Sequence, residues 1–480
     1  MLDRREFLKA AGLVALAPSA CVTSTQENGA WVNDIHSQLN RTWVSAVRRP
    51  ASIDELRAAM RGKGAVCISG GKHAMGGQQF ASNATLLDMN AMRRVLGFDR
   101  ERGIIEVESG IQWPALIAAT KDSPWAIRQK QTGADRLSIG GALAANVHGR
   151  GLTMKPFIDD VESFTLIDAG GQLIECSRAN NRELFSLVIG GYGVFGVVAS
   201  VQLRLSPRRK VQRVVEEQDI ESVMRAFDAR IADGFHYGDF QFSIDSASEG
   251  FLRKGVFSCY KPVSDDTPMA PAQAELKPED WMKLLYLAHA DKEQVYRQYV
   301  GYYLSTSGQV YWSDEHQLSF YPDGYHQTLD PLLQMPPGSE MITELYVPRP
   351  KLADFMLAAA EDLRRRKGNV VYGTVRLIER DDESYLAWAK EPYACVIFNL
   401  HVEHSDAGKA RAADSFRALI DLVAARGGSY YLTYHRWARR DQVERCYPRF
   451  ASFLAEKKRF DPRQRFQSEW YRHYEAMFAS

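Results

Sequence analysis

The most informative stretch of this chain is Ser69-Gly70-Gly71-Lys72-His73-Ala74-Met75-Gly76-Gly77-Gln78. Four glycines in ten residues leave little side-chain bulk, so backbone N–H groups can approach a ligand closely and point at it. No Gly-Lys-Ser/Thr ending follows, which excludes a nucleotide-binding P-loop. Taken alone, the loop fits either an anion-cradling turn with a histidine at its centre or an ordinary surface turn.

Size and composition restrict the alternatives. The chain has 480 residues, enough for two domains with substantial cores, and its 45% hydrophobic and 25% charged residues are ordinary globular values. A net charge of +1 gives no general attraction to nucleic acid, and we expect no nucleic-acid partner. The six cysteines are scattered without a C-x-x-C pair, which predicts buried free thiols and no metal site.

The N-terminus indicates export. Arg4-Arg5 is followed by Phe7-Leu8-Lys9 and by an apolar stretch at 10–17 that is too short to span a bilayer. Residues 1–26 therefore resemble a twin-arginine signal, which predicts a periplasmic protein; an ordinary amphipathic helix is the alternative. Membrane attachment is expected only if Cys21 carries a lipid.

Two further segments are rich in small residues. Residues 132–151 would let a flat ligand lie against the backbone with few side chains in the way. Residues 190–196 contain a G-x-G-x-x-G match, but a predicted helix at 181–189 precedes it and a predicted strand at 197–205 follows it. A dinucleotide fingerprint needs the opposite order, so a Rossmann fold is excluded here.

Hydrophobic periodicity gives a coarse outline of the elements. A helix is expected after Ser52, with Ser52 as its N-cap and Glu55 at the third helical position. A hairpin is expected at 161–168 and 172–177, and a surface excursion at 261–278. The other expected helices cover 112–121, 220–231, 350–366 and 409–426, and the other expected strands cover 240–244, 340–347, 370–377 and 395–401.

This chain resembles the vanillyl-alcohol-oxidase-type (PCMH-type) FAD flavoproteins, because four of its segments match motifs of that family in the same order. The segments are the glycine loop, residues 137–145, His148-Gly149-Arg150 and residues 190–198. The resemblance implies an α+β fold with a two-subdomain FAD-binding domain at 39–207. It also implies a substrate (cap) domain with an antiparallel sheet at 208–428 and a C-terminal segment, 429–480, that returns to the FAD-binding domain.

The same resemblance implies FAD as the cofactor. His73 would be the covalent link to the 8α-methyl of the flavin, or a non-covalent packing histidine. Residues 129–135 contain no cysteine, which excludes a second, cysteinyl link at that place. The residues expected to bind the cofactor are Ser69, Gly70, Gly71, Lys72, His73, Ala74, Gln78, Gly133, Ser138, Gly141, His148, Gly149 and Val198.

Four residues are expected to be catalytic by similarity to alditol oxidases and decaprenylphosphoryl-ribose oxidase: Arg376, Asn399, His401 and Tyr434. Asn399 and His401 are two apart in a predicted strand and share a face, and a histidine can take and release a proton near neutral pH. The chain departs from the family where a lysine is usual, near Tyr434, and where alditol oxidases have a glutamate, at Thr374. An ordinary structural role is the alternative for each of Arg376, Asn399 and His401.

The expected reaction is oxidation of an alcohol group on a sugar, polyol or related hydroxy compound, with hydride transfer to flavin N5. Electrons would leave to oxygen, a quinone or a soluble carrier. The alternatives are a lactone or hydroxy-acid dehydrogenase on the same scaffold, and a non-catalytic flavin- or sugar-binding module. Aromatic residues between Tyr302 and Tyr325 could line the substrate pocket or pack in the core.

Overall fold

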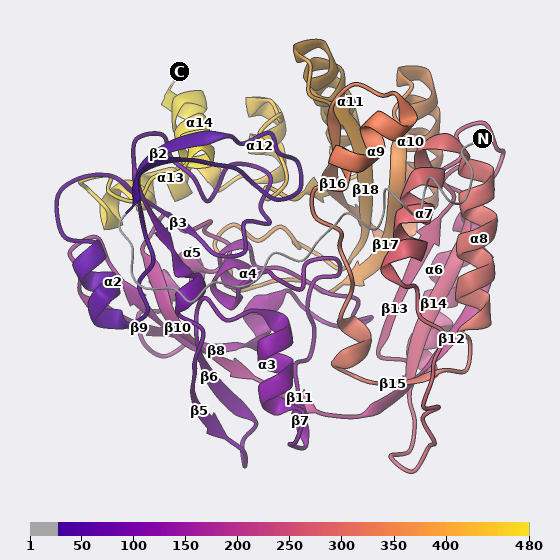
Figure 1. The fold of residues 1–480 in the computed structure, drawn as a ribbon, viewed down its shortest axis with the longest axis horizontal. Helices are drawn as coiled ribbons and strands as arrows, with labels where there is room; N and C mark the ends of the chain where they lie inside the picture. Colours follow the sequence, from indigo (N-terminus) through magenta and orange to yellow (C-terminus); the bar gives the residue numbers. More distant parts are fainter. Residues whose placement is uncertain (1–26, 480) are drawn as a thin grey trace.

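The computed structural model describes residues 27–479, so the predictions for residues 1–26, including the export signal and Cys21, lie outside it. Figure 1 shows two halves side by side, the first built from the N-terminal part of the chain and the second from its middle part. The C-terminal helices lie on the first half (Figure 1). Within the described residues, no helix is both long enough and apolar enough to cross a bilayer.

The first half contains two sheets, as the two-subdomain prediction requires. One has the order β1-β2-β4-β3, with β2, β4 and β3 parallel; the other has the order β5-β6-β10-β8-β9 and is antiparallel. The strands are β1 (Glu27–Val32), β2 (Thr42–Arg48), β3 (Val66–Ser69), β4 (Thr85–Asp88), β5 (Val95–Asp99), β6 (Ile104–Glu108), β8 (Val161–Ile167), β9 (Leu173–Ser177) and β10 (Val197–Arg204). Two short strands, β7 (Trp125–Ala126) and β11 (Ser206–Pro207), form a separate antiparallel pair in this half.

The helices of the first half follow the sequence signals. In α2 (Ile53–Ala59), Ser52 Oγ accepts the Glu55 N–H, and the Glu55 carboxylate accepts the Ala51 N–H, which is the predicted capping arrangement. The remaining helices are α3 (Trp113–Thr120), α4 (Ile139–Ala145) and α5 (Arg182–Val188). Because α5 ends before residues 190–196 and β10 begins after them, the exclusion of a Rossmann fingerprint is confirmed.

The second half is one antiparallel sheet in the order β15-β12-β14-β13-β17-β18-β16-β19. Its strands are β12 (Lys210–Asp219), β13 (Tyr237–Phe242), β14 (Lys254–Pro262), β15 (Val310–Trp312), β16 (Gly338–Pro348), β17 (Val370–Ile378), β18 (Tyr393–Glu403) and β19 (Ser429–Tyr430). The predicted α+β class and the antiparallel sheet of the cap are confirmed.

Helices cover both faces of the cap sheet. On β14, Phe257 packs against Phe227 of α6 (Ile220–Ala232), whereas the adjacent Val256 packs against Val300 and Tyr303 of α8 (Lys292–Ser305). Because neighbouring strand residues point to opposite faces, α6 and α8 lie on opposite sides of the sheet. The other helices of this half are α7 (Pro278–Ala290), α9 (His326–Leu333), α10 (Leu352–Arg366) and α11 (Asp406–Ala424).

The five described cysteines are buried free thiols, as predicted. Residues 263–277, within the expected surface excursion, form no helix or strand and are mostly exposed. Helices α7 and α8 were not predicted, because their aromatic-rich sequences show only a weak apolar stripe.

The C-terminal segment returns to the first half. It forms α12 (Arg440–Cys446), α13 (Phe450–Phe460) and α14 (Glu469–Ala479). The Val66 N–H donates to the Arg465 carbonyl and the Glu469 N–H donates to the Phe80 carbonyl, so the returning chain lies beside β3. At the end of α13, Lys457 Nζ and Asp461 Oδ2 are 2.5 Å apart and form an ion pair, with both side chains fully buried. Asp461 also accepts the Phe466 N–H at 2.8 Å.

We predict that Lys457→Met lowers the free energy of unfolding by about 3–5 kcal/mol, because it leaves the Asp461 carboxylate buried without its cation. The matched control is Arg440→Met, which breaks an exposed ion pair with Glu444 at the same i, i+4 spacing and is expected to cost less than about 1 kcal/mol. Urea unfolding of both variants measures the difference. Equal losses would contradict the anchoring role of the buried pair.

Candidate functional site

One large cavity lies between the two halves, with a volume of about 2230 Å³. Its walls are the glycine loop, residues 131–141, the exposed face of the cap sheet and the segment 318–325. This volume exceeds the range of about 300–1,000 Å³ that is typical of sites for single small molecules. The cavity can therefore hold a dinucleotide and a second small molecule together.

The glycine loop lies in close contact with residues 136–138, through the Ser138 side chain at Gly70 and through the backbone at Gly71. A Cβ atom at Gly70 would lie 2.0 Å from Ser138 Oγ, and one at Gly71 would lie 2.0 Å from the Arg136 carbonyl oxygen. No other residue fits these two positions without moving the backbone. The loop also contains Lys72 at φ 59°, a left-handed conformation that exposes successive backbone N–H groups.

The residues predicted to bind the cofactor converge on this cavity. All of them line it except Ser69 and Gly149. The Ser69 side chain is buried and its hydroxyl has no hydrogen-bond partner among the described residues. The Gly149 N–H donates to Gln129 at 3.1 Å, so this glycine supports the wall from behind.

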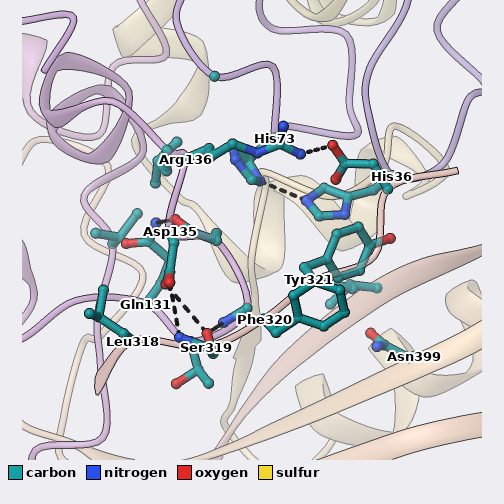
Figure 2. A pocket seen from close by; sticks show the side chains of 18 of the residues that line it. His36, His73, Gln131, Asp135, Arg136, Leu318, Ser319, Phe320, Tyr321 and Asn399 are labelled. Carbon is teal, nitrogen blue, oxygen red and sulfur yellow. Dashed lines mark hydrogen bonds and ion pairs between the residues drawn. The ribbon is translucent and has the colours of Figure 1, made fainter. Parts of the chain in front are cut away.

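His73 lies in the cavity wall, opposite a second histidine that was not predicted (Figure 2). His73 Nδ1 and His36 Nε2 are 2.8 Å apart, and Tyr321 packs edge-on against His36. Burial lowers the pKa of His36 to about 4; burial, with the nearby His36 and Arg136, holds the pKa of His73 well below its usual value. Both imidazoles are therefore neutral near pH 7, and one hydrogen is shared between them.

The cap segment 318–325, called the strap below, lies along one side of the cavity (Figure 2). Ser319 Oγ accepts the Gly133 N–H at 2.7 Å, and the Ser319 N–H donates to Asp135 at 3.0 Å. Lys130 Nζ is buried between Asp135, at 2.6 Å, and the Gln317 carbonyl, at 3.0 Å. These contacts hold the strap against the predicted flavin-binding segment.

The cap sheet supplies the polar wall opposite the glycine loop. Arg376, Asn399 and Tyr434 line the cavity, as the prediction of catalytic roles requires, whereas His401 does not. The His401 ring lies against Glu340, which does line the cavity, so His401 can reach a ligand only through that carboxylate. The catalytic roles of these four residues stay predictions.

Tyr434 and His435 lie in the irregular segment after β19, not in the expected strand, but their side chains still face different surroundings. Tyr434 faces the cavity, whereas His435 is buried among Phe416, Tyr430 and Trp437. Burial, and then the charge of Glu344, raises the pKa of the Tyr434 phenol well above its usual value. Tyr434 is therefore a hydrogen-bond donor at neutral pH.

His148 and Glu344 form a buried pair in the same wall, with His148 Nε2 2.6 Å from Glu344 Oε1. The other ring nitrogen, Nδ1, lies 3.1 Å from the Gly149 carbonyl oxygen. Both ring nitrogens thus face oxygen atoms that can accept a hydrogen bond. Glu344 Oε1 also accepts hydrogen bonds from Tyr346, at 2.6 Å, and from Cys395, at 3.3 Å.

Several residues of the cavity were missed by the analysis of the sequence. His36, Glu340, Glu344 and Tyr372 line it but belong to no motif. Alternation along β16 is the one signal that could have indicated Glu344, since a glutamate inside an otherwise apolar strand needs a partner. The aromatic residues of 302–325 that line the cavity are Tyr302, Tyr303, Tyr311, Phe320, Tyr321 and Tyr325.

Comparison with known proteins agrees with this geometry. Residues 44–177 match the model of a family described as an FAD binding domain. This part of the chain is a PCMH-type FAD-binding domain. Its cofactor is FAD.

The curated relatives each match about a third of this chain. An uncharacterized oxidoreductase from the fasciation locus of Rhodococcoides fascians is 30% identical over 33% of this chain and 36% of its own length. L-gulonolactone oxidase of Bos taurus is 25% identical over 38% of this chain and 42% of its own length. Cytokinin dehydrogenase 1 of Arabidopsis thaliana is 26% identical over 32% of this chain and 26% of its own length. The similarity thus spans less than half of each relative.

The residues present fit FAD. Gly70 and Gly71 carry no side chain, so a diphosphate can reach the backbone N–H groups of the loop. Two buried polar atoms of the same loop, the Ser69 hydroxyl and His73 Nε2, have no hydrogen-bond partner among the described residues and could bind the cofactor. The sequence predicted this half of the site because its determinants are close together in the chain.

We predict that Gly71→Ala lowers the FAD content of the purified protein several-fold, because the new methyl group collides with the Arg136 carbonyl and displaces the loop. Gly97→Ala is the matched control, since a Cβ atom at Gly97 meets nothing within 4 Å. Absorbance of flavin relative to protein measures the effect. Full flavin content in Gly71→Ala would contradict the role of this close approach.

Proposed function

We propose that this protein is an FAD-dependent oxidoreductase that oxidises an alcohol group of a small hydroxy compound. The observation that carries the proposal is the guanidinium of Arg376. Arg376 is only 5% exposed and lines the cavity, and no carboxylate among residues 27–479 forms an ion pair with it. A buried cation without a counter-ion is costly, and it suits a substrate that brings or develops negative charge on oxygen.

The neighbouring side chains fit the same reaction. When bound, FAD supplies the hydride acceptor, so the protein has to orient the substrate and take its hydroxyl proton. Arg376 and Tyr434 donate hydrogen bonds to the reacting oxygen, and the amide of Asn399 orients the substrate from the adjacent strand. The Asn399 Oδ1 atom has no hydrogen-bond partner among the described residues, so it is available for a substrate hydroxyl.

Glu344 is the proton acceptor in this proposal. Its Oε1 atom contacts His148, Tyr346 and Cys395, and the residue lines the cavity. The adjacent His148 ring holds the carboxylate in place and offers a route by which the proton can leave. The predicted role of His401 as a base would need transfer through Glu340.

The alternatives differ in what Arg376 binds. A 2-hydroxy acid would place its carboxylate on the guanidinium, and a lactone-derived substrate would place a ring oxygen there. The matches to L-gulonolactone oxidase and to L-gulono-1,4-lactone dehydrogenase of Mycobacterium tuberculosis favour testing lactones early. A non-catalytic binding module is the third alternative, since the lysine usual near Tyr434 is missing.

A covalent bond between His73 and the flavin is part of the proposal. The neutral His73 has a lone pair for such a bond, and its contact with His36 fixes the ring in the cavity wall. The electron acceptor would be oxygen, a quinone or a soluble carrier. Export by the twin-arginine route, with FAD already bound, is proposed from residues 1–26 alone.

Acid precipitation tests the bond. We predict that flavin stays in the pellet of the wild-type protein and moves to the supernatant in His73→Ala, because only a covalent bond survives unfolding. His236→Ala, which removes an exposed histidine elsewhere, is expected to behave as the wild type. Release of all flavin from the wild-type protein would exclude the covalent bond and leave FAD binding intact.

Anaerobic flavin reduction tests the role of Arg376. We screen sugars, polyols, lactones and 2-hydroxy acids for bleaching of the flavin, and expect Arg376→Ala to lower kcat/KM for the best substrate by about 100- to 1,000-fold. Arg411→Ala removes an exposed arginine of α11 and is expected to change nothing. A broad panel that never bleaches the flavin would favour the binding module. Normal turnover by Arg376→Ala would refute the role of Arg376.

A further inference from the structure

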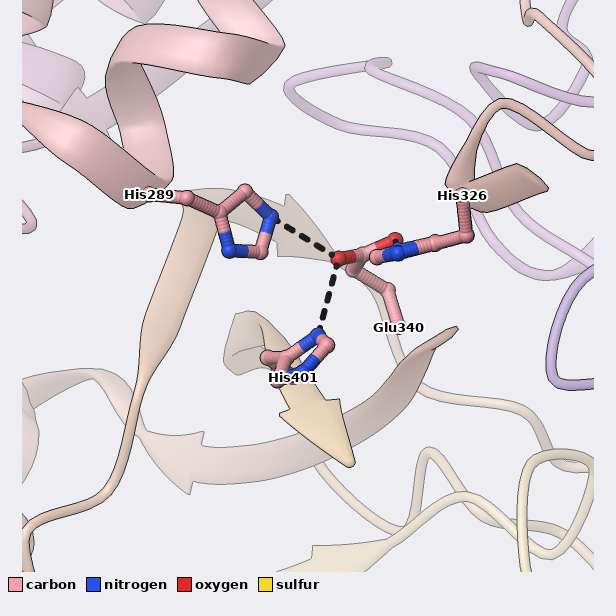
Figure 3. A group of neighbouring side chains, drawn as sticks. All are labelled: His289, His326, Glu340 and His401. Atoms are coloured by element: carbon pink, nitrogen blue, oxygen red, sulfur yellow. Dashed lines mark hydrogen bonds and ion pairs between the residues drawn. The ribbon is translucent and has the colours of Figure 1, made fainter. Parts of the chain in front are cut away.

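Three histidines and a glutamate meet at the edge of the cavity, where Glu340 lines the cavity and the three histidines do not (Figure 3). They are His289, near the end of α7; His326, the first residue of α9; Glu340 on β16; and His401 on β18. One side-chain ligand atom from each lies within 4.8 Å of all the others. None of the four is used in the proposed reaction, and the flavin-binding half contributes none.

The contacts converge on a point rather than forming pairs. His289 Nε2 is 3.3 Å and His401 Nδ1 is 3.6 Å from Glu340 Oε1, while His326 Nε2 is 2.6 Å from Glu340 Oε2. Ligand atoms held at about 2.1 Å from a tetrahedral zinc ion are about 3.4 Å apart. The two distances to Oε1 already match that spacing.

The cluster contains several buried polar atoms without partners. Both ring nitrogens of His289, both of His401, and Glu340 Oε1 have no hydrogen bond within the described part of the chain. The side chains are 1% exposed for His289 and 7% for His401 and Glu340. Leaving buried polar atoms unsatisfied costs about 1–3 kcal/mol each, so this grouping needs a shared partner.

A surrounding layer of contacts orients the four side chains. His326 Nδ1 lies 2.6 Å from Asp330 Oδ1, and this contact orients the ring so that Nε2 points toward Glu340. Asp330 is held in turn by the Gly338 N–H at 2.9 Å. A carboxylate behind the outer ring nitrogen is the usual support of a histidine that binds metal.

Backbone geometry also makes room for the cluster. Glu340 and His401 are directly opposite in the antiparallel register of β16 and β18. A Cβ atom at Gly338 would lie 2.4 Å from Cε1 and 2.7 Å from Nε2 of His401, so only glycine lets the imidazole lie there. The Tyr325 hydroxyl donates to Glu340 Oε2 and fixes the carboxylate from the cavity side.

We propose that His289, His326, Glu340 and His401 bind one divalent transition-metal ion, and that this ion is zinc. Three imidazoles and one carboxylate suit zinc, whereas calcium and magnesium prefer all-oxygen sites. Four protein ligands close the coordination sphere, so the ion is structural. It joins α7 and α9 to the sheet and holds the stretch of cavity wall formed by Glu340 and Asn399.

Metal analysis of the full-length protein, purified without chelators or an affinity tag that binds metal, tests the proposal. We expect one zinc per chain in the wild-type protein, and at least a tenfold lower content in His289→Gln and His401→Asn. His236→Ala is the control and is expected to keep its zinc. Dipicolinate treatment should lower the melting temperature of the wild-type protein, and added Zn²⁺ should restore it, with no such response in His401→Asn.

X-ray absorption of the wild-type protein keeps the proposal testable if the variants do not fold. Zinc with three imidazole nitrogens and one oxygen at about 2.0–2.1 Å would support it. A sulfur ligand, stoichiometric iron or manganese in place of zinc, or a wild-type protein that neither contains nor binds Zn²⁺ would overturn it. Because flavin content and turnover are measured separately, failure here leaves the proposed oxidoreductase activity standing.

Discussion

The whole arrangement depends on the close contact between the glycine loop and residues 136–138. Gly70 and Gly71 allow the two chain segments to approach more closely than a larger residue would permit. This contact places main-chain atoms in one wall of the cavity, and main-chain N–H groups bind a diphosphate without regard to the rest of the ligand. A surface of this kind holds a cofactor but cannot select a substrate, so selection falls to the cap.

The cap can select a substrate because alternate residues of its strands point to opposite faces of the sheet. One face of its sheet is covered by α6 and its neighbours, and the other presents Arg376, Asn399 and Glu344 to the cavity. The charges lie in a largely buried wall, where they interact more strongly than they would in water. The strap at Ser319 joins this wall to the FAD-binding domain through contacts with Gly133 and Asp135, so the two walls keep a defined separation.

The FAD-binding half could be predicted from the sequence because its determinants are local. Loop glycines, the capping of α2 by Ser52 and the hairpin of β8 and β9 each depend on residues a few positions apart. The cap half could be predicted only as a list of elements. The pairing of β16 with both β18 and β19, which builds the polar wall, joins residues that are tens of positions apart and carry no motif.

The His401 prediction shows where local reasoning ends. Alternation correctly places Asn399 and His401 on one face of β18, but the two side chains meet different neighbours. Asn399 opens to the cavity, whereas Glu340 lies between His401 and the cavity, and α7 and α9 bring two further histidines to that side. These ligands come from positions 289, 326, 340 and 401, so no spacing rule could have joined them.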